Sequence, residues 1–188
     1  HPTNEEAEFI ERNLLGYSPL DITDVSIVVC PNSPFVFPAS PLLSAGQFRL
    51  IVKNQAVFQA TYPSVSPALI AGTYSGSLSN SGERVAIDDA NGNTVVDMEY
   101  SDDDPWPQSA DGSGASLELI TSDIDENSPA EKYYFWRGSS EAGGSPGTDG
   151  IGALNVIINE VVSNSDSQPD SIELLNTGSA TVNIGGWY

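Results

Sequence analysis

The sequence predicts an all-β sandwich. Gly, Pro, Ser, Asn and Asp interrupt the chain about every eight to twelve residues, which is the spacing of short strands and their turns in β-sandwiches. A long helical periodicity is missing. Hydrophobic residues make up 39% of the 188 residues, so the chain has enough apolar surface to bury a core and wholesale disorder is not expected.

The first strongly patterned segment predicts a strand followed by a short helix. Residues 45–54, AGQFRLIVKN, have the apolar and β-branched character of a strand. Residues 54–63, NQAVFQATYP, follow directly and are typical of a short helical turn that Pro63 ends.

A β-hairpin is predicted in the middle of the chain. Residues 84–87 (RVAI) and 94–100 (TVVDMEY) flank the turn sequence Asp-Ala-Asn-Gly-Asn. This turn places Gly92 where a positive φ is needed. The alternating segment GASLELI, residues 114–120, predicts a further strand.

The end of the chain repeats its beginning at a constant offset of 162 residues. Ile10 and Glu11 align with Ile172 and Glu173 without a gap. The same offset aligns Gly16 with Gly178, Leu20 with Val182, Asp21 with Asn183, and Ile22 with Ile184. The sequence therefore predicts one unit of 162 residues and the first 26 residues of a second.

The two copies differ in what precedes them. Residues 155–162, NVIINEVV, form a β-branched run before the second copy, whereas only His1 and its neighbours precede the first. We expect the first unit to lack this strand and to offer an open sheet edge. Burial would stabilise the apolar side chains of the run by about 1.5–3 kcal/mol each, which is comparable to the backbone entropy of ordering it. The predicted intersubunit strand comprises Val156, Ile157, Ile158, Val161 and Val162.

Long motifs in the chain resemble the lamin-tail domain of bacterial secreted and surface proteins. They are residues 81–120, SGERVAIDDANGNTVVDMEYSDDDPWPQSADGSGASLELI, and residues 127–147, NSPAEKYYFWRGSSEAGGSPG, while residues 156–188 look like the start of another such domain. The resemblance implies an immunoglobulin-like β-sandwich that is usually a non-catalytic module. Gly185, Gly186 and Trp187 depart from Thr23, Asp24 and Val25 of the first copy.

The repeat, the resemblance and the composition together divide the chain into three parts. Residues 1–137 are expected to form a lamin-tail-like sandwich without its own first strand. Residues 138–153 are rich in Gly, Ser and Pro and are typical of a linker. Residues 154–188 are expected to start a second repeat or to form a donated strand.

The charge balance excludes some partners. Twenty-six acidic residues and six basic ones give a net charge of −20. Such a surface repels nucleic acid, whose binding needs Lys and Arg to displace counterions. The sequence has no run of eighteen apolar residues, so membrane insertion is not expected.

The residues that most enzymes use for catalysis are scarce, and we expect no enzymatic activity. His1, at the start of the sequence, is the only histidine, so we expect no Ser-His or Cys-His arrangement within one chain. Cys30 is the only cysteine and follows the apolar run SIVV, so it is expected to be a small buried side chain.

Calcium is the only cofactor that the sequence suggests, and the alternative is that the acidic residues form turns exposed to water. Two loops offer the hard oxygen ligands that calcium prefers. They contain Asp102, Asp103 and Asp104 in one loop, and Asp123, Asp125 and Asn127 in the other. The second loop is not an EF-hand, because Ser128 and Tyr134 stand where Gly and Glu would be required.

Three functional hypotheses follow. The first is a structural protein of the cell exterior, whose copies join head to tail in a filament or tandem array by β-strand addition through residues 155–162. The second is a secreted binding module for a glycan or protein, for which Tyr133, Tyr134 and Trp136 could form a carbohydrate platform. The third is an accessory domain of a secreted enzyme.

Overall fold

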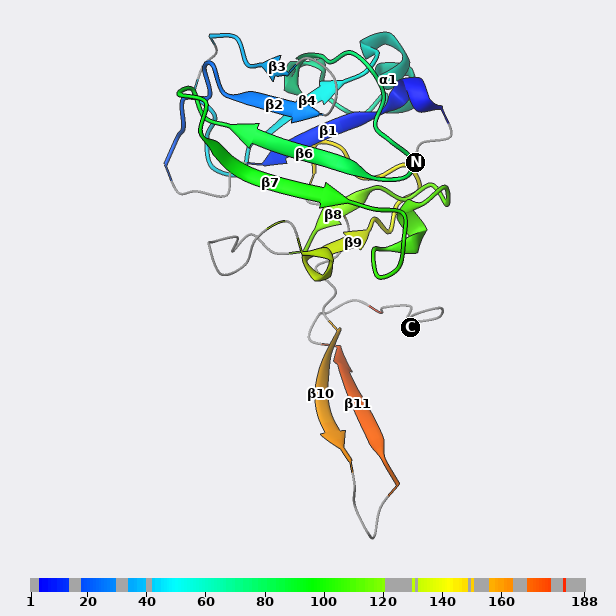
Figure 1. Ribbon diagram of the computed structural model, residues 1–188. Coiled ribbons are helices and arrows are strands. Elements are labelled where there is room, and N and C mark those ends of the chain that lie inside the picture. Colours follow the sequence, from blue (N-terminus) through cyan, green and yellow to red (C-terminus); the bar gives the residue numbers. More distant parts are fainter. Residues whose placement is uncertain are drawn as a thin grey trace. The chain divides into compact units, whose positions relative to one another are not determined.

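The protein is mainly β, and its strands are arranged in several antiparallel sheets (Figure 1). The computed structural model describes residues 4–13, 18–29, 34–39, 42–120, 130, 132–148, 150, 156–163, 169–176 and 181. The chain divides into a first unit, His1–Ile151, and a second unit, Gly152–Tyr188. Each unit is described by itself.

The described residues contain eleven strands, one short α-helix and four 3-10 turns. The strands are β1 (Phe9–Asn13), β2 (Ser26–Val29), β3 (Phe35–Val36), β4 (Phe48–Val52), β5 (Ile70–Thr73), β6 (Glu83–Asp88), β7 (Thr94–Tyr100), β8 (Leu117–Leu119), β9 (Trp136–Gly138), β10 (Val156–Val162) and β11 (Ser171–Asn176). The helix is α1 (Gln55–Thr61), and the turns are η1 (Glu5–Ala7), η2 (Pro67–Leu69), η3 (Gln108–Ala110) and η4 (Tyr133–Phe135).

The described part of the first unit contains three sheets. The strand orders are β1-β4-β5, β3-β2-β6-β7 and β8-β9. All neighbouring strands are antiparallel except β4 and β5, which run parallel because α1 lies between them in the chain.

The larger hydrophobic core takes side chains from both of the larger sheets. Ile51 of β4 packs in one buried cluster with Ile27 and Val29 of β2. Ile10 of β1 and Ile87 of β6 pack against the same cluster. Residues that lie far apart in the chain therefore share one core.

Strand β4 separates this core from a smaller one under the helix. Successive side chains of a strand point to opposite faces, so Leu50 and Val52 lie on the face opposite to Ile51. They form a second buried cluster with Phe58 of α1. Asn54 caps the helix, because its side-chain oxygen accepts hydrogen bonds from the N–H groups of two residues in the first turn.

The structure confirms the elements that short stretches of sequence predicted. The predicted strand, helix and hairpin correspond to β4, α1 and the β6–β7 pair. Gly92 lies in the hairpin turn with a φ of 82°, and β8 falls within the predicted strand at 114–120. None of the described helices is long and apolar enough to span a bilayer.

Candidate functional site

The residues predicted to join subunits form strand β10 of the second unit. Val156, Ile157, Ile158, Val161 and Val162 all lie in this strand, which pairs with β11 as an antiparallel hairpin. His1, Cys30 and Trp187, which the sequence also singled out, lie outside the described residues.

The pairing register separates two chemically different faces of the hairpin. Directly opposite residues of an antiparallel pair share a face, and successive residues alternate. One face, here called the apolar face, carries Val156, Ile158, Val161, Ile172, Leu174 and Asn176. The other, here called the mixed face, carries Ile157, Glu160, Val162, Ser171, Glu173 and Leu175.

A bulge at Asn159 creates the apolar face. The register shifts between Ile158 and Glu160, so one extra residue stands in β10. Without it, Ile158 and Val161 would point to opposite faces, because they are three residues apart. The side-chain amide of Asn159 donates a hydrogen bond to Glu173 on the facing strand.

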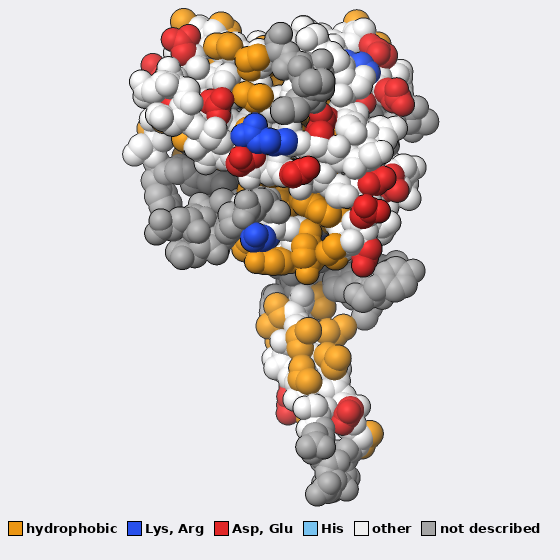
Figure 2. Space-filling view, viewed as in Figure 1, with side chains coloured by type: hydrophobic (Ala, Val, Ile, Leu, Met, Phe, Trp, Pro, Cys, Tyr) orange, Lys and Arg blue, Asp and Glu red, His pale blue; other side chains and the backbone are white. Residues whose placement is uncertain are grey.

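The apolar face is open to solvent. Its four central side chains, Ile158, Val161, Ile172 and Leu174, are between 46% and 65% exposed. Figure 2 shows apolar side chains gathered along the hairpin. A contiguous exposed apolar surface is typical of an interaction site.

The hairpin also reproduces the start of the first unit. Strand β11 begins at residue 171 and β1 at residue 9, which is the repeat offset of 162 (171 − 9 = 162). The equivalent isoleucines have different surroundings, since Ile10 packs against the larger core and Ile172 is exposed. Within the described part of the second unit, β11 thus repeats the pattern of β1 without the buried surroundings that Ile10 has.

The acidic loop after β7 is stabilised by its own hydrogen bonds. The N–H of Asp103 donates to Ser101 Oγ, and the carbonyl oxygen of Asp102 accepts from the side-chain amide of Gln108. Within the described ranges, no group of three or more His, Cys, Asp or Glu side chains could hold a metal ion. The other candidate ligands, Asp123, Asp125 and Asn127, lie outside the described residues. The structure therefore brings Asp102, Asp103 and Asp104 to one loop without assigning calcium to it.

The aromatic residues near η4 do not share one plane. Tyr133 and Tyr134 are exposed, and their rings meet at 81°. The indole N–H of Trp136 donates to the carbonyl oxygen of Ala130 at 2.6 Å. The rings of Tyr133 and Tyr134 therefore do not form one flat surface with each other, and the carbohydrate platform stays a prediction.

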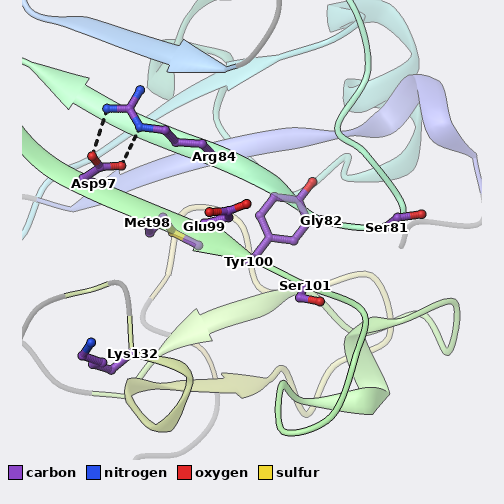
Figure 3. A pocket seen from close by; sticks show the side chains of 9 residues that line it. All are labelled: Ser81, Gly82, Arg84, Asp97, Met98, Glu99, Tyr100, Ser101 and Lys132. Atoms are coloured by element: carbon purple, nitrogen blue, oxygen red, sulfur yellow. Dashed lines mark hydrogen bonds and ion pairs between the residues drawn. The ribbon is translucent and has the colours of Figure 1, made fainter.

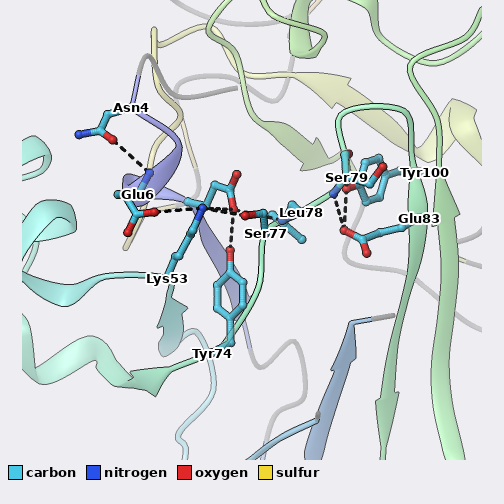
Figure 4. A network of polar contacts seen from close by, with 10 residues as sticks. Asn4, Glu6, Lys53, Tyr74, Ser77, Leu78, Ser79, Glu83 and Tyr100 are labelled. Carbon is cyan, nitrogen blue, oxygen red and sulfur yellow. Dashed lines mark hydrogen bonds and ion pairs between the residues drawn. The ribbon is translucent and has the colours of Figure 1, made fainter. Parts of the chain in front are cut away.

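A buried carboxylate, that of Glu8, links segments of the first unit that lie far apart in the chain. Figure 4 shows its partners Lys53, Tyr74 and Leu78. Glu8 is almost fully buried and accepts hydrogen bonds from Tyr74 Oη at 3.2 Å and from the N–H of Leu78 at 3.1 Å. Lys53 Nζ lies 3.8 Å from Glu8 Oε2 and 3.3 Å from Oε1 of the exposed Glu6. These polar contacts are all made within the protein, which indicates a structural role.

The buried tyrosines predict a loss of stability in alkali. Burial raises the pKa of Tyr74, with Glu8 adding to the effect, and burial raises the pKa of Tyr100, with Glu83 adding to it. Above pH ~10, the ordinary tyrosine value, the unfolded chain releases these protons while the folded chain retains them. We therefore expect the free energy of unfolding to be unaffected by these groups below pH ~10 and to fall as the pH rises further.

Urea unfolding at several alkaline pH values measures this effect. The variant Tyr74→Phe should show a shallower fall than the unmodified chain, since one of the titrating groups is gone. An equal fall in both proteins would contradict the assignment to Tyr74.

A groove lies beside β7 in the first unit. It has a volume of about 640 Å³, and its lining includes Met98, Glu99 and Tyr100 of β7 and Lys132 (Figure 3). Arg84 and Asp97, on the facing strands β6 and β7, form a bidentate ion pair at its wall, with contacts of 2.7 and 3.0 Å.

The sequence patterns did not identify two residues of the apolar face as interface residues. Ile172 and Leu174 belong to it as much as the residues of β10 do. Their spacing of two residues is a signal of a strand face, but the segment SIELLN also contains Leu175 on the opposite face. The pairing register places Leu174 on the apolar face and Leu175 on the mixed face.

The fold and the site define a mainly β protein whose second unit contains a hairpin with an exposed apolar face. Comparison with protein-family models and with curated proteins finds no match.

Proposed function

We propose that the protein is a non-catalytic structural protein, a subunit or repeat of an extracellular filament or surface array. Its units join head to tail by β-strand addition through the C-terminal hairpin. The observation that supports this proposal most strongly is the exposed apolar face on β10 and β11. Covering its central side chains would stabilise an assembly by about 1.5–3 kcal/mol for each one fully buried.

The lamin-tail resemblance is consistent with this role. It implies an immunoglobulin-like sandwich, and a core shared by two sheets is what such a sandwich requires. A head-to-tail contact uses two different surfaces, so it propagates from copy to copy instead of ending in a dimer.

Two neighbouring cross-strand pairs of the β10–β11 hairpin, one on each face, allow the proposed assembly to be tested. We expect Ile158→Glu with Leu174→Glu, which charges the apolar face, to raise the concentration needed for assembly about a hundredfold. The reason is the loss of at least about 3 kcal/mol of apolar burial. Light scattering against concentration and electron microscopy measure the assembly.

The matched control is Ile157→Glu with Leu175→Glu. These residues are the neighbouring cross-strand pair and lie on the mixed face, so the added charge is the same and the apolar face is kept. Like-charge repulsion alone is expected to raise the assembly concentration by about tenfold at most. If the unmodified chain stays monomeric at all concentrations, the proposal is wrong, and a binding module becomes the better hypothesis. Equal effects of the two double variants would also contradict it.

A further inference from the structure

Among the residues that the structure describes, strand β7 presents a long open edge. It stands at the end of the four-stranded sheet and, with seven residues, is the longest such strand in the described part of the first unit. One of its edges pairs with β6, and no other backbone hydrogen bond between described residues reaches Thr94–Tyr100. An edge of this length is a template for pairing with a strand of another chain.

The groove lies beside β7 and is lined by residues from more than one segment of the chain. Met98, Glu99 and Tyr100 line it from β7, and Lys132 lies across from them (Figure 3). Tyr133 and Tyr134 follow Lys132 in the chain and are exposed. The groove lining is thus followed in the chain by two exposed aromatic side chains.

The positive and negative side chains that line the groove are equal in number. Arg84 and Lys132 balance Asp97 and Glu99 in its lining, whereas the whole chain has a net charge of −20. The described hairpin residues include three acids, Glu160, Asp170 and Glu173, and no Lys or Arg. Electrostatic repulsion between the groove and an acidic hairpin is therefore small compared with the repulsion from the chain as a whole.

We infer that the groove beside β7 is the acceptor for the C-terminal hairpin of a second copy. Strand β10 has seven residues, as β7 has, and only one of its edges is paired within the described hairpin. Docking extends the four-stranded sheet to the order β3-β2-β6-β7-β10-β11, and the apolar face covers Tyr133 and Tyr134. This inference rests on the proposed function, because it names the partner surface for the same hairpin.

A charge added to the groove should weaken assembly selectively. Ser81 lines the groove and is exposed, and Ser44 is exposed in the loop before β4, outside the groove lining. We expect Ser81→Glu to raise the assembly concentration about tenfold through like-charge repulsion, and Ser44→Glu to leave it unchanged. Equal effects of the two variants in light scattering would overturn the assignment of the groove.

Cross-linking between two populations of the full chain locates the contact directly. Both populations contain Cys30→Ser, one with Glu99→Cys and the other with Ile157→Cys, and they are mixed with a short bismaleimide. We expect a cross-linked pair of one chain from each population, and none when Ser44→Cys replaces Glu99→Cys.

The outcomes separate the inference from the proposed function. Polymers without the Glu99–Ile157 cross-link would show that the hairpin docks elsewhere, which overturns the inference and leaves the proposed function standing. A monomeric chain would contradict both. A cross-link formed within one doubly substituted monomer at high dilution would overturn docking between copies.

Discussion

Replacing Glu8 with alanine is expected to lower the free energy of unfolding by about 3–5 kcal/mol, which is the typical cost of breaking a buried ion pair from one side. The carboxylate is buried and accepts hydrogen bonds from Tyr74 and Leu78. Its loss leaves the partly buried Lys53 without its buried partner and removes the acceptor of the Tyr74 hydroxyl. Urea unfolding at neutral pH, followed by circular dichroism, measures the change.

Glu6 provides the matched control for this experiment. It is also an ion-pair partner of Lys53, at 3.3 Å, but its side chain is 52% exposed. Exposed pairs contribute about 0.2–1 kcal/mol, so Glu6→Ala should cost no more than that. If Glu8→Ala and Glu6→Ala lowered stability equally, burial would not be the source of the effect.

Replacing Phe58 with alanine is expected to cost about 3–5 kcal/mol, because a large cavity would open in the smaller core. Phe58 is fully buried between α1 and β4. Its ring centroid lies 5.6 Å from that of Phe9 in β1 and 4.8 Å from that of Tyr62 after α1, so both aromatic contacts are lost together with the packing against β4. The same urea titration measures this loss.

An exposed aromatic residue is the control for Phe58. Tyr134 is 55% exposed on η4, and its replacement by alanine should change stability by less than about 0.5 kcal/mol. A loss below about 1 kcal/mol for Phe58→Ala would indicate that the smaller core is not closely packed.

Local sequence patterns predicted the elements whose stability is decided nearby. The β6–β7 hairpin depends on Gly92 and its neighbours, and α1 depends on Asn54 and Pro63, all within a few residues. Strands such as β2 and β5 were not predicted, because their partners are distant in the chain. In the β2–β6 pair, for example, Val29 lies opposite Val85.

The candidate site was predicted in part. The sequence identified β10 from its β-branched residues and related β11 to β1 through the repeat. It did not identify the groove beside β7, since Lys132 comes from a segment that only tertiary packing brings to the lining with residues of the β6–β7 hairpin. The immunoglobulin-like form of the fold stays a prediction.

By itself, the sequence determined that the chain is mainly β, that it is strongly acidic, and that its end repeats its beginning. These properties follow from composition and local spacing, which need no knowledge of distant contacts. Only the tertiary structure decided that Glu8 is buried and that Ile158, Val161, Ile172 and Leu174 share one face. The reason is that burial depends on partners such as Tyr74, 66 residues away, and the apolar face depends on a bulge and a register that no single strand contains.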